Sequence, residues 1–240
     1  MDITKITRPA RKALPLKYCG AVIVAAGNAS RMGGIDKVMA QLRGEPMIKR
    51  TVREFQNCDA ISEIVVVTRE DLILPIRELC AGMEKVKAVV AGGKSRQESV
   101  GLGLNALSDK VKLAAVHDGA RPLITWQVID RVVRAANTYG AAAPAIPVKD
   151  TIKTVQGGIV KNTPDRSTLF AVQTPQIFDF DLLRGALKKA QLDGAQVTDD
   201  CSAVERMGMS VKIVEGDERN IKVTTPLDLT IAHLLLEETV

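Results

Sequence analysis

The chain has 240 residues, of which 46% are hydrophobic and 25% are charged, a composition typical of a soluble globular protein. Lysine and arginine exceed aspartate and glutamate by 33 − 28 = 5, and residues 1–18 alone carry a net charge of +4. Because the remaining chain is nearly neutral and only 3% aromatic, we exclude an extended nucleic-acid surface. We predict a basic, flexible tail over residues 1–18 and a single domain over residues 19–240.

The sequence shows no membrane-spanning segment and no signal peptide. Its apolar stretches stay well below the ~20 residues of a membrane helix, and the N-terminus lacks an apolar core. The four cysteines form no Cys-x-x-Cys pair and there are two histidines, so we expect no zinc site. We expect a cytoplasmic protein with reduced cysteines and without a membrane partner.

Segments of strand type alternate with segments of helix type along the first 147 residues. The first is Ala21–Ala26, an uncharged run of small and β-branched residues that predicts a buried parallel strand. This alternation predicts a Rossmann-like α/β fold, with a mostly parallel sheet and helices on both faces. The predicted strands are 21–26, 63–68, 87–91, 113–116 and 141–147, and the predicted helices are 47–56, 75–81, 97–107 and 126–137.

The alternation breaks at residues 151–166. Thr151–Val155 and Ile159–Thr163 flank a glycine turn and predict a polar β-hairpin that projects from the sheet as an arm. Because an isolated hairpin is marginally stable, we expect this arm to pack on a second subunit. The α/β pattern then resumes with a strand at 170–173, a helix at 180–190, a helix at 198–207 capped by Thr198, a strand at 211–214, and a last helix that Thr225-Pro226 opens and that buries Leu227, Ile231, Leu234 and Leu235.

The loop after the first strand has the features of a phosphate site. Gly27 opens a segment without bulky side chains, whose backbone N–H groups can approach an anion closely. Arg31 and Lys37 follow within ten residues, and two cations beside such a loop suit a polyphosphate. The alternative is an ordinary strand-to-helix turn with two solvated basic residues.

Further polar residues follow the other predicted strands. Gly93 and Ser99 follow the third strand, Asp118 and Arg121 follow the fourth, and Thr151 follows the fifth. Ligands of open parallel sheets bind beyond the carboxyl ends of the strands, so this convergence predicts one ligand site. The structural alternatives are a turn cap for Asp118, a solvated loop for Arg121, an unremarkable Lys222 and a structural His117.

Three common site types do not fit the spacing. Gly93-Lys94-Ser95 resembles the end of a Walker A loop, but Ala88 stands where its first glycine belongs. The segment after the first strand is not a Gly-x-Gly-x-x-Gly fingerprint, and the chain has no nucleophile elbow for Ser-His-Asp hydrolysis.

Eight segments, in chain order, resemble the 2-C-methyl-D-erythritol 4-phosphate cytidylyltransferase family, nucleotidyltransferases of the non-mevalonate isoprenoid pathway. The chain departs from the family pattern at Ala29, Asp36, Lys94 and Gly119, and none of these changes removes a cation expected at the triphosphate. The eight segments are Ala25-Ala26-Gly27 with Arg31-Met32 and Lys37; Gly92-Gly93 with Arg96 and Ser99-Val100; Val116 to Pro122; Pro147 to Lys153; Asp165-Arg166; Gln173 to Gln176; Thr198-Asp199-Asp200 with Ser202-Ala203; and Asn220-Ile221-Lys222.

The resemblance implies transfer of CMP from CTP to 2-C-methyl-D-erythritol 4-phosphate, with release of pyrophosphate. It implies that Arg31, Lys37 and Lys222 are catalytic, that Mg²⁺ or another divalent cation bridges the triphosphate, and that the chain forms a homodimer with exchanged arms. The CTP-binding residues would be Ala25, Ala26, Gly27, Gly93, Ser99 and Gly119. The residues binding the sugar-alcohol phosphate would be Asp118, which also touches the metal, and Arg121, Thr151, Arg166, Thr174 and Thr198.

Two other functions stay open from the sequence. A ribitol-5-phosphate cytidylyltransferase would share the fold and the CTP motifs. A non-catalytic nucleotide-binding protein is the more distant alternative, and it is disfavoured because Arg31, Lys37, Asp118 and Lys222 are all retained.

Overall fold

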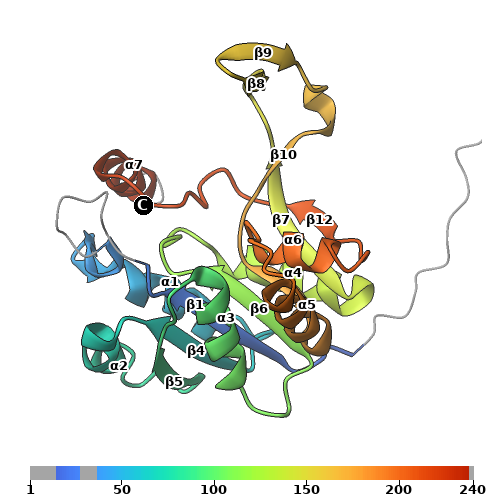
Figure 1. Ribbon diagram of the computed structural model, residues 1–240. Helices are drawn as coiled ribbons and strands as arrows, with labels where there is room; N and C mark the ends of the chain where they lie inside the picture. Colours follow the sequence, from blue (N-terminus) through green and yellow to red (C-terminus); the bar gives the residue numbers. More distant parts are fainter. Residues whose placement is uncertain (1–14, 28–36, 238–240) are drawn as a thin grey trace, which may run out of the picture.

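A computed structural model describes residues 15–27 and 37–237 (Figure 1). Most of the predicted basic tail, Arg31 and the departures at Ala29 and Asp36 lie outside the described residues. Within these residues, no helix has both the length and the apolar character needed to cross a membrane.

An eight-stranded sheet forms the centre of the fold, in the order β10-β7-β11-β6-β1-β4-β5, with β12 paired to β7. β1, β4, β5 and β6 run parallel, as do β7 and β12, whereas β10 and β11 are antiparallel to their neighbours. The strands of the sheet are β1 Cys19–Ala25, β4 Glu63–Thr68, β5 Val86–Ala91, β6 Leu113–Asp118, β7 Ala141–Pro147, β10 Phe170–Val172, β11 Gln176–Asp179 and β12 Lys212–Glu215.

Helices cover both faces of this sheet, as the alternation predicts. α1 (Met47–Asn57), α2 (Ile73–Leu79) and α4 (Trp126–Tyr139) pack on one face, and α3 (Arg96–Asn105), α5 (Phe180–Leu192) and α6 (Asp200–Glu205) pack on the other. Along β1, Ala21 and Ile23 face the first set of helices and Val22 faces the second. A strand covered on both faces needs apolar side chains at nearly every position, which explains why β1 is a run of small and β-branched residues.

The predicted arm is confirmed as a projecting hairpin. β8 (Thr154–Gln156) and β9 (Ile159–Asn162) pair only with each other among the described strands, and their residues are exposed. Figure 1 shows the arm standing away from the sheet, with the 3-10 helix η3 (Arg166–Thr168) on the return path. The smaller elements of the main body are β2 Gln41–Leu42, β3 Glu45–Pro46, η1 Lys37–Met39 and η2 Glu70–Leu72.

The strand predicted at 170–173 and the helix predicted at 180–190 are confirmed as β10 and α5. They do not extend the parallel pattern, because β10 and the unpredicted β11 are antiparallel to their neighbours. The predicted cap of the next helix is wrong. α6 begins at Asp200 and is capped by Asp199, whose carboxylate reaches the Ser202 N–H, so Thr198 is not the cap.

The last helix, α7 (Pro226–Glu237), begins as predicted. Thr225 and Asp228 exchange hydrogen bonds around its first turn. Of its predicted buried face only Leu235 packs on the core, beside the fully buried Ala232, whereas Leu227 is 67% and Leu234 56% exposed. Leucines lie on more than one side of this helix, so the spacing of apolar residues did not determine which side packs.

Candidate active site

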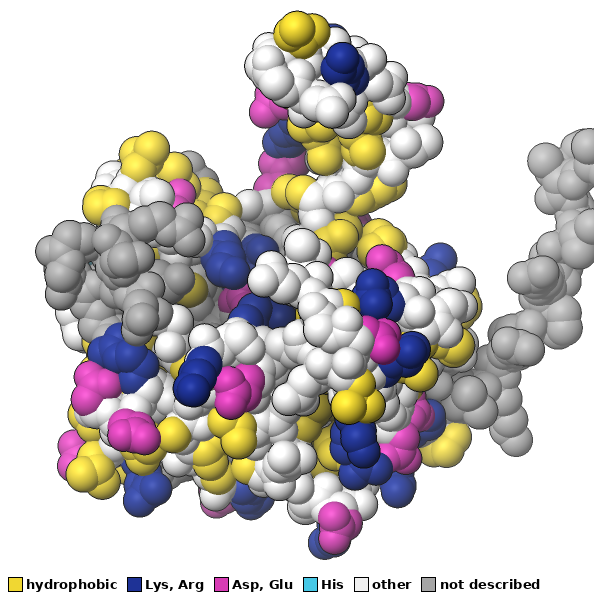
Figure 2. All heavy atoms as spheres, in the orientation of Figure 1, with side chains coloured by type: hydrophobic (Ala, Val, Ile, Leu, Met, Phe, Trp, Pro, Cys, Tyr) yellow, Lys and Arg dark blue, Asp and Glu magenta, His cyan; other side chains and the backbone are white. Residues whose placement is uncertain are grey.

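A cleft of about 430 Å³ lies beyond the carboxyl ends of β1, β4, β5 and β6, where the sequence predicts a ligand site. Figure 2 shows Lys and Arg side chains gathered in the hollow below the arm. The predicted site residues that line the cleft are Ala25, Ala26, Gly27, Gly93, Ser99, Asp118 and Lys222.

The turn from β5 to α3 forms one wall of the cleft. The Ser99 hydroxyl accepts a hydrogen bond from the Gly93 N–H (3.1 Å) and donates one to the Ser95 carbonyl (2.9 Å), while Ser95 caps α3. A Cβ on Gly92 would lie 2.3 Å from the Cβ of Ala26, so glycine allows the two loops to touch. This wall is therefore built and held by the protein itself.

Asp118, at the end of β6, lies among three cations. Its carboxylate oxygens are 2.8 Å from Lys222 Nζ, 3.5 Å from Arg96 Nε and 3.8 Å from Arg121 Nε. Burial alone would raise the pKa of Asp118, but Lys222 and Arg96 outweigh it and lower this pKa to about 2. The carboxylate is thus ionised at neutral pH and holds cations from separate parts of the chain in the cleft.

Thr174 and His117 lie beneath Asp118. The Thr174 hydroxyl accepts a hydrogen bond from the Asp118 N–H (3.1 Å) and lies 2.9 Å from His117 Nδ1. Thr174 is only 4% exposed and does not line the cleft, so its contacts favour positioning of Asp118 over direct contact with a substrate. Burial lowers the pKa of His117 to about 3, which leaves it neutral and fits its structural interpretation, although it belongs to β6 rather than to a turn.

Arg121 and Gly119 support the cleft from below. Arg121 Nη1 donates to the carbonyl of Asn220 (2.6 Å), and this contact ties it to the segment that carries Lys222. Gly119 is buried, with its N–H on the Val24 carbonyl (2.8 Å) and its carbonyl accepting from Thr51. Both residues lie next to Asp118 and outside the lining of the cleft.

The remaining predicted site residues divide into two groups. Lys37 begins η1, whose next residue, Val38, lines the cleft, and Arg31 lies outside the described residues. Thr151, Arg166 and Thr198 are exposed and lie outside the cleft. Arg166 Nη1 donates to the Lys149 carbonyl (2.8 Å) at the base of the arm, so the chain does not bring its own arm residues to its own cleft.

Comparison with known proteins decides the family. The family model for 2-C-methyl-D-erythritol 4-phosphate cytidylyltransferase matches residues 19–238. The chain belongs to this family. It is therefore a cytidylyltransferase, a nucleotidyltransferase of isoprenoid precursor biosynthesis, and the predicted resemblance is confirmed.

Individual relatives agree with the family match. The chain is 47% identical to the 2-C-methyl-D-erythritol 4-phosphate cytidylyltransferase of Symbiobacterium thermophilum, covering 90% of this chain and 92% of the relative. It is 45% identical to that of Geobacillus kaustophilus, covering 90% and 96%.

Solved structures show the same fold. A 4-diphosphocytidyl-2C-methyl-D-erythritol synthase from Anaerococcus prevotii superimposes with a TM-score of 0.83 at 29% identity, covering 92% of this chain and 96% of that one. The 2-C-methyl-D-erythritol 4-phosphate cytidylyltransferase from Thermus thermophilus gives 0.75 at 32% identity, covering 90% and 98%.

For this cytidylyltransferase, sequence reasoning assigned Arg96 no separate role and missed Asp200. Arg96 lines the cleft, and its guanidinium joins Asp118 to Asp200, which is 2.8 Å from Nη2. The signal was present, because Arg96 and Asp200 both belong to segments that carry the family resemblance. The helix predicted at 198–207 places Asp200 in its first turn, and that position gives no sign of the side-chain contact.

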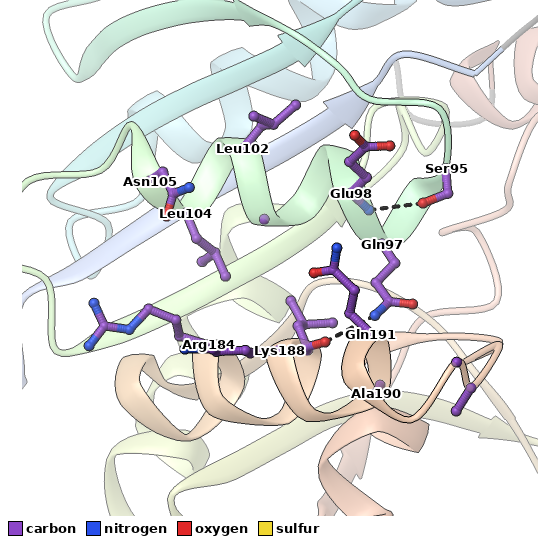
Figure 3. Close-up of a pocket in the computed structure, with 14 residues that line it drawn as sticks. Ser95, Gln97, Glu98, Leu102, Leu104, Asn105, Arg184, Lys188, Ala190 and Gln191 are labelled. Atoms are coloured by element: carbon purple, nitrogen blue, oxygen red, sulfur yellow. Dashed lines mark hydrogen bonds between the residues drawn. The ribbon is translucent and has the colours of Figure 1, made fainter.

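A second groove, of about 610 Å³, lies between α3 and α5 (Figure 3). Gln97 crosses it and donates a hydrogen bond to the Leu187 carbonyl (3.0 Å). None of the residues predicted for the cytidylyltransferase site lines this groove. The cleft around Asp118 is therefore the candidate active site.

Proposed function

We propose that this chain transfers CMP from CTP to 2-C-methyl-D-erythritol 4-phosphate, giving 4-diphosphocytidyl-2-C-methyl-D-erythritol and pyrophosphate. The observation that carries the proposal is the Asp118–Lys222 contact of 2.8 Å inside a cleft walled by Gly93 and Ser99. This contact places a cation in a pocket at the carboxyl ends of the parallel strands, where nucleotides bind in α/β folds.

The chemistry needs no general base. A phosphate monoester has its second pKa near ~6, so the attacking phosphate is largely ionised at neutral pH. One of its oxygens attacks the α-phosphorus of CTP, a new P–O bond forms, and the bond to the bridging oxygen breaks as pyrophosphate leaves. The protein must align two anions and stabilise the charge that develops between them. Arg31, Lys37 and Lys222 take this role in the proposal.

The cytosine would lie against the wall of small residues. Ala25, Ala26 and Gly27, at the end of β1, line one side of the cleft, and Gly93 and Ser99 line the opposite side. Close backbone on two sides suits a single-ring base and leaves little room for a purine. Gly119 would act indirectly here, because its backbone groups bond to Val24 and Thr51 and hold the end of β6 in place.

The proposal includes a divalent cation, Mg²⁺, that enters with the triphosphate. No cluster of three His, Cys, Asp or Glu residues able to hold a metal occurs in the described part of the chain. Mg²⁺ is commonly held by one or two carboxylates together with substrate phosphates, and Asp118 supplies a carboxylate in the cleft. Once bound, the metal would neutralise charge on the phosphate oxygens.

The sugar-alcohol phosphate would bind between Arg121, Thr198 and an arm supplied by a second copy of the chain. Thr151 and Arg166 lie on an arm whose Val155 and Ile159 are more than half exposed, so the arm has apolar surface to bury in a homodimer. A composite site of this kind explains why these residues lie far from the cleft of their own chain.

Residues 19–240 are proposed as a single nucleotidyltransferase domain, with 151–166 as the dimerisation arm and 1–18 as a basic tail. The family match over residues 19–238 supports this division. All four cysteines are buried and free, which is consistent with a reducing, cytoplasmic location.

The test is pyrophosphate release from CTP and Mg²⁺ with either 2-C-methyl-D-erythritol 4-phosphate or ribitol 5-phosphate. We expect release with the first acceptor only. Release with ribitol 5-phosphate alone would preserve the mechanism and refute the proposed acceptor. No release with either acceptor, while CTP still binds, would point to a non-catalytic nucleotide-binding protein.

A further inference from the structure

One buried carboxylate reaches the cleft through an arginine. Asp200 is 1% exposed, and its Oδ2 lies 2.8 Å from Arg96 Nη2. The same guanidinium places its Nε 3.5 Å from Oδ1 of Asp118. Arg96 therefore links α3, β6 and α6, three elements that are distant in the sequence, at the edge of the cleft.

The backbone at Asp200 is anchored to the sheet by Gln176. The side-chain carbonyl of Gln176 accepts from the N–H groups of Asp200 and Cys201, at 3.0 Å each. The Gln176 amide also donates to the Asp199 carboxylate (2.8 Å). Because Gln176 belongs to β11, these contacts tie the backbone at Asp200 to the sheet, and the Asp200 carboxylate meets Arg96 from there.

This arrangement decides how the cations share Asp118. Lys222 takes the shortest contact with Asp118, at 2.8 Å, while Arg96 makes its shorter contact with Asp200 instead. Burial tends to lower the pKa of Arg96, but Asp200 and Asp118 together raise it, so the guanidinium stays charged. Burial raises the pKa of Asp200, and the neighbouring Arg96 opposes this rise. With this carboxylate replaced, Arg96 is expected to turn to Asp118 and to compete with Lys222.

We propose that Asp200 is a positioning residue for cytidylyl transfer, which holds Arg96 so that Asp118 can orient Lys222. The inference rests on the proposed function, because the reaction supplies its readout. Asp200 does not line the cleft, and its carboxylate meets Arg96, which does, so its effect must pass through Arg96. The effect of replacing Asp200 should therefore depend on whether Arg96 is present, which a purely structural role would not require.

The experiment compares steady-state kinetics of Asp200→Asn, Arg96→Gln and the double variant. Asp200→Asn is expected to lower kcat about tenfold or more, with a smaller change in KM for CTP, because Lys222 would be misplaced in the transition state. If Asp200 acts through Arg96, the double variant is no slower than Arg96→Gln alone. Losses that multiply, or an unchanged kcat in Asp200→Asn, would overturn the inference.

The matched control is Asp193→Asn, which removes an exposed carboxylate that lies 3.4 Å from Arg206 outside the cleft. It should keep the kcat of the unmodified chain, and thermal melting should show that every variant is folded. If Asp200→Asn alone does not fold, the kcat of the folded double variant is compared with that of Arg96→Gln. A double variant that is a further tenfold slower would again overturn the inference. Failure of the unmodified chain to release pyrophosphate would refute the proposed function first, and this inference with it.

Discussion

The cleft and the arm are built on opposite principles. In the cleft, charges are packed together and paired, and the Asp118 side chain is 11% exposed among Lys222, Arg96 and Arg121. In the arm the side chains lie open to solvent, and apolar Val155 and Ile159 are 58% and 66% exposed. The charged cluster of the cleft is thus formed within one chain, whereas the apolar side chains of the arm are left uncovered by the described part of their own chain.

The largest effect is expected at the cleft. Lys222→Ala should lower kcat about 10²–10³-fold, as typically follows from removing one donor that stabilises transition-state charge. KM for CTP should change far less, because the contact strengthens in the transition state. Steady-state pyrophosphate release measures both constants. The control is Lys189→Ala, which removes an exposed ion pair with Asp193. If Lys222→Ala changed only the KM for CTP, Lys222 would bind the ground state alone and would not stabilise the transition state.

A smaller effect is expected at the arm. Arg166→Ala should raise KM for 2-C-methyl-D-erythritol 4-phosphate about 10- to 100-fold, since hydrogen bonds to charged groups contribute about 1.5–3 kcal/mol. KM for CTP should stay unchanged. Arg184→Ala removes an exposed surface pair with Asp181 and should behave like the unmodified chain. An unaltered KM for the acceptor in Arg166→Ala would show that Arg166 of the arm does not bind the acceptor.

The third prediction concerns the apolar surface of the arm and the affinity of the proposed homodimer. Ile159→Asp should weaken the homodimer about tenfold or more, because burying an Ile side chain contributes about 1.5–3 kcal/mol and a charge reverses that gain. Sedimentation over a range of concentrations measures the dissociation constant. Leu192→Asp changes a leucine that is 78% exposed on α5 and should leave it unaltered. An unmodified chain that is a fully active monomer would contradict the exchanged-arm proposal.

The last prediction concerns the pH dependence of stability beneath the cleft and leaves the reaction itself aside. Burial lowers the pKa of His117 to about 3, from an ordinary value of 6.5. Between these pH values the unfolded chain binds a proton that the folded chain does not, so the free energy of unfolding falls as the pH falls. We expect a loss of up to about 1.4 kcal/mol per pH unit below pH 6.

Denaturant unfolding at several pH values measures this slope. His117→Gln should flatten it, whereas His233→Gln, at the other histidine of the chain, should keep it. Equal slopes for the two variants would show that His117 is not the group responsible.

Regular elements were predictable where one physical requirement dominates. β4 has the predicted bounds because a buried parallel strand demands a run of apolar residues, and β7, which is mixed in pairing but buried along most of its length, has them as well. β11 was missed because it lies between β6 and β7 as an antiparallel strand, and nothing local in Gln176–Asp179 indicates that pairing. The buried face of α7 was predicted poorly for a related reason, since the packing of this helix depends on distant segments rather than on its own periodicity.

The candidate site was predictable to the same degree. The rule that ligands bind at strand ends brought Gly93, Ser99 and Asp118 together correctly, and the family resemblance added Lys222, which is distant from Asp118 in the sequence. The rule did not foresee that Thr174 is buried beneath Asp118, because that burial follows from the course of the chain into β11. Side-chain contacts across the sheet therefore required the structure.

The most direct test of the account is to mix two impaired variants, Lys222→Ala and Arg166→Ala, at an acceptor concentration where neither alone shows appreciable activity. If the cleft of one chain works with the arm of another, a mixed dimer contains one site with both residues intact. Subunit exchange should then restore pyrophosphate release to roughly a quarter of the unmodified rate, because half of the dimers are mixed and each has one such site. No recovery, in a mixture shown to contain mixed dimers, would contradict the claim that cleft and arm of two chains form one cytidylyl-transfer site.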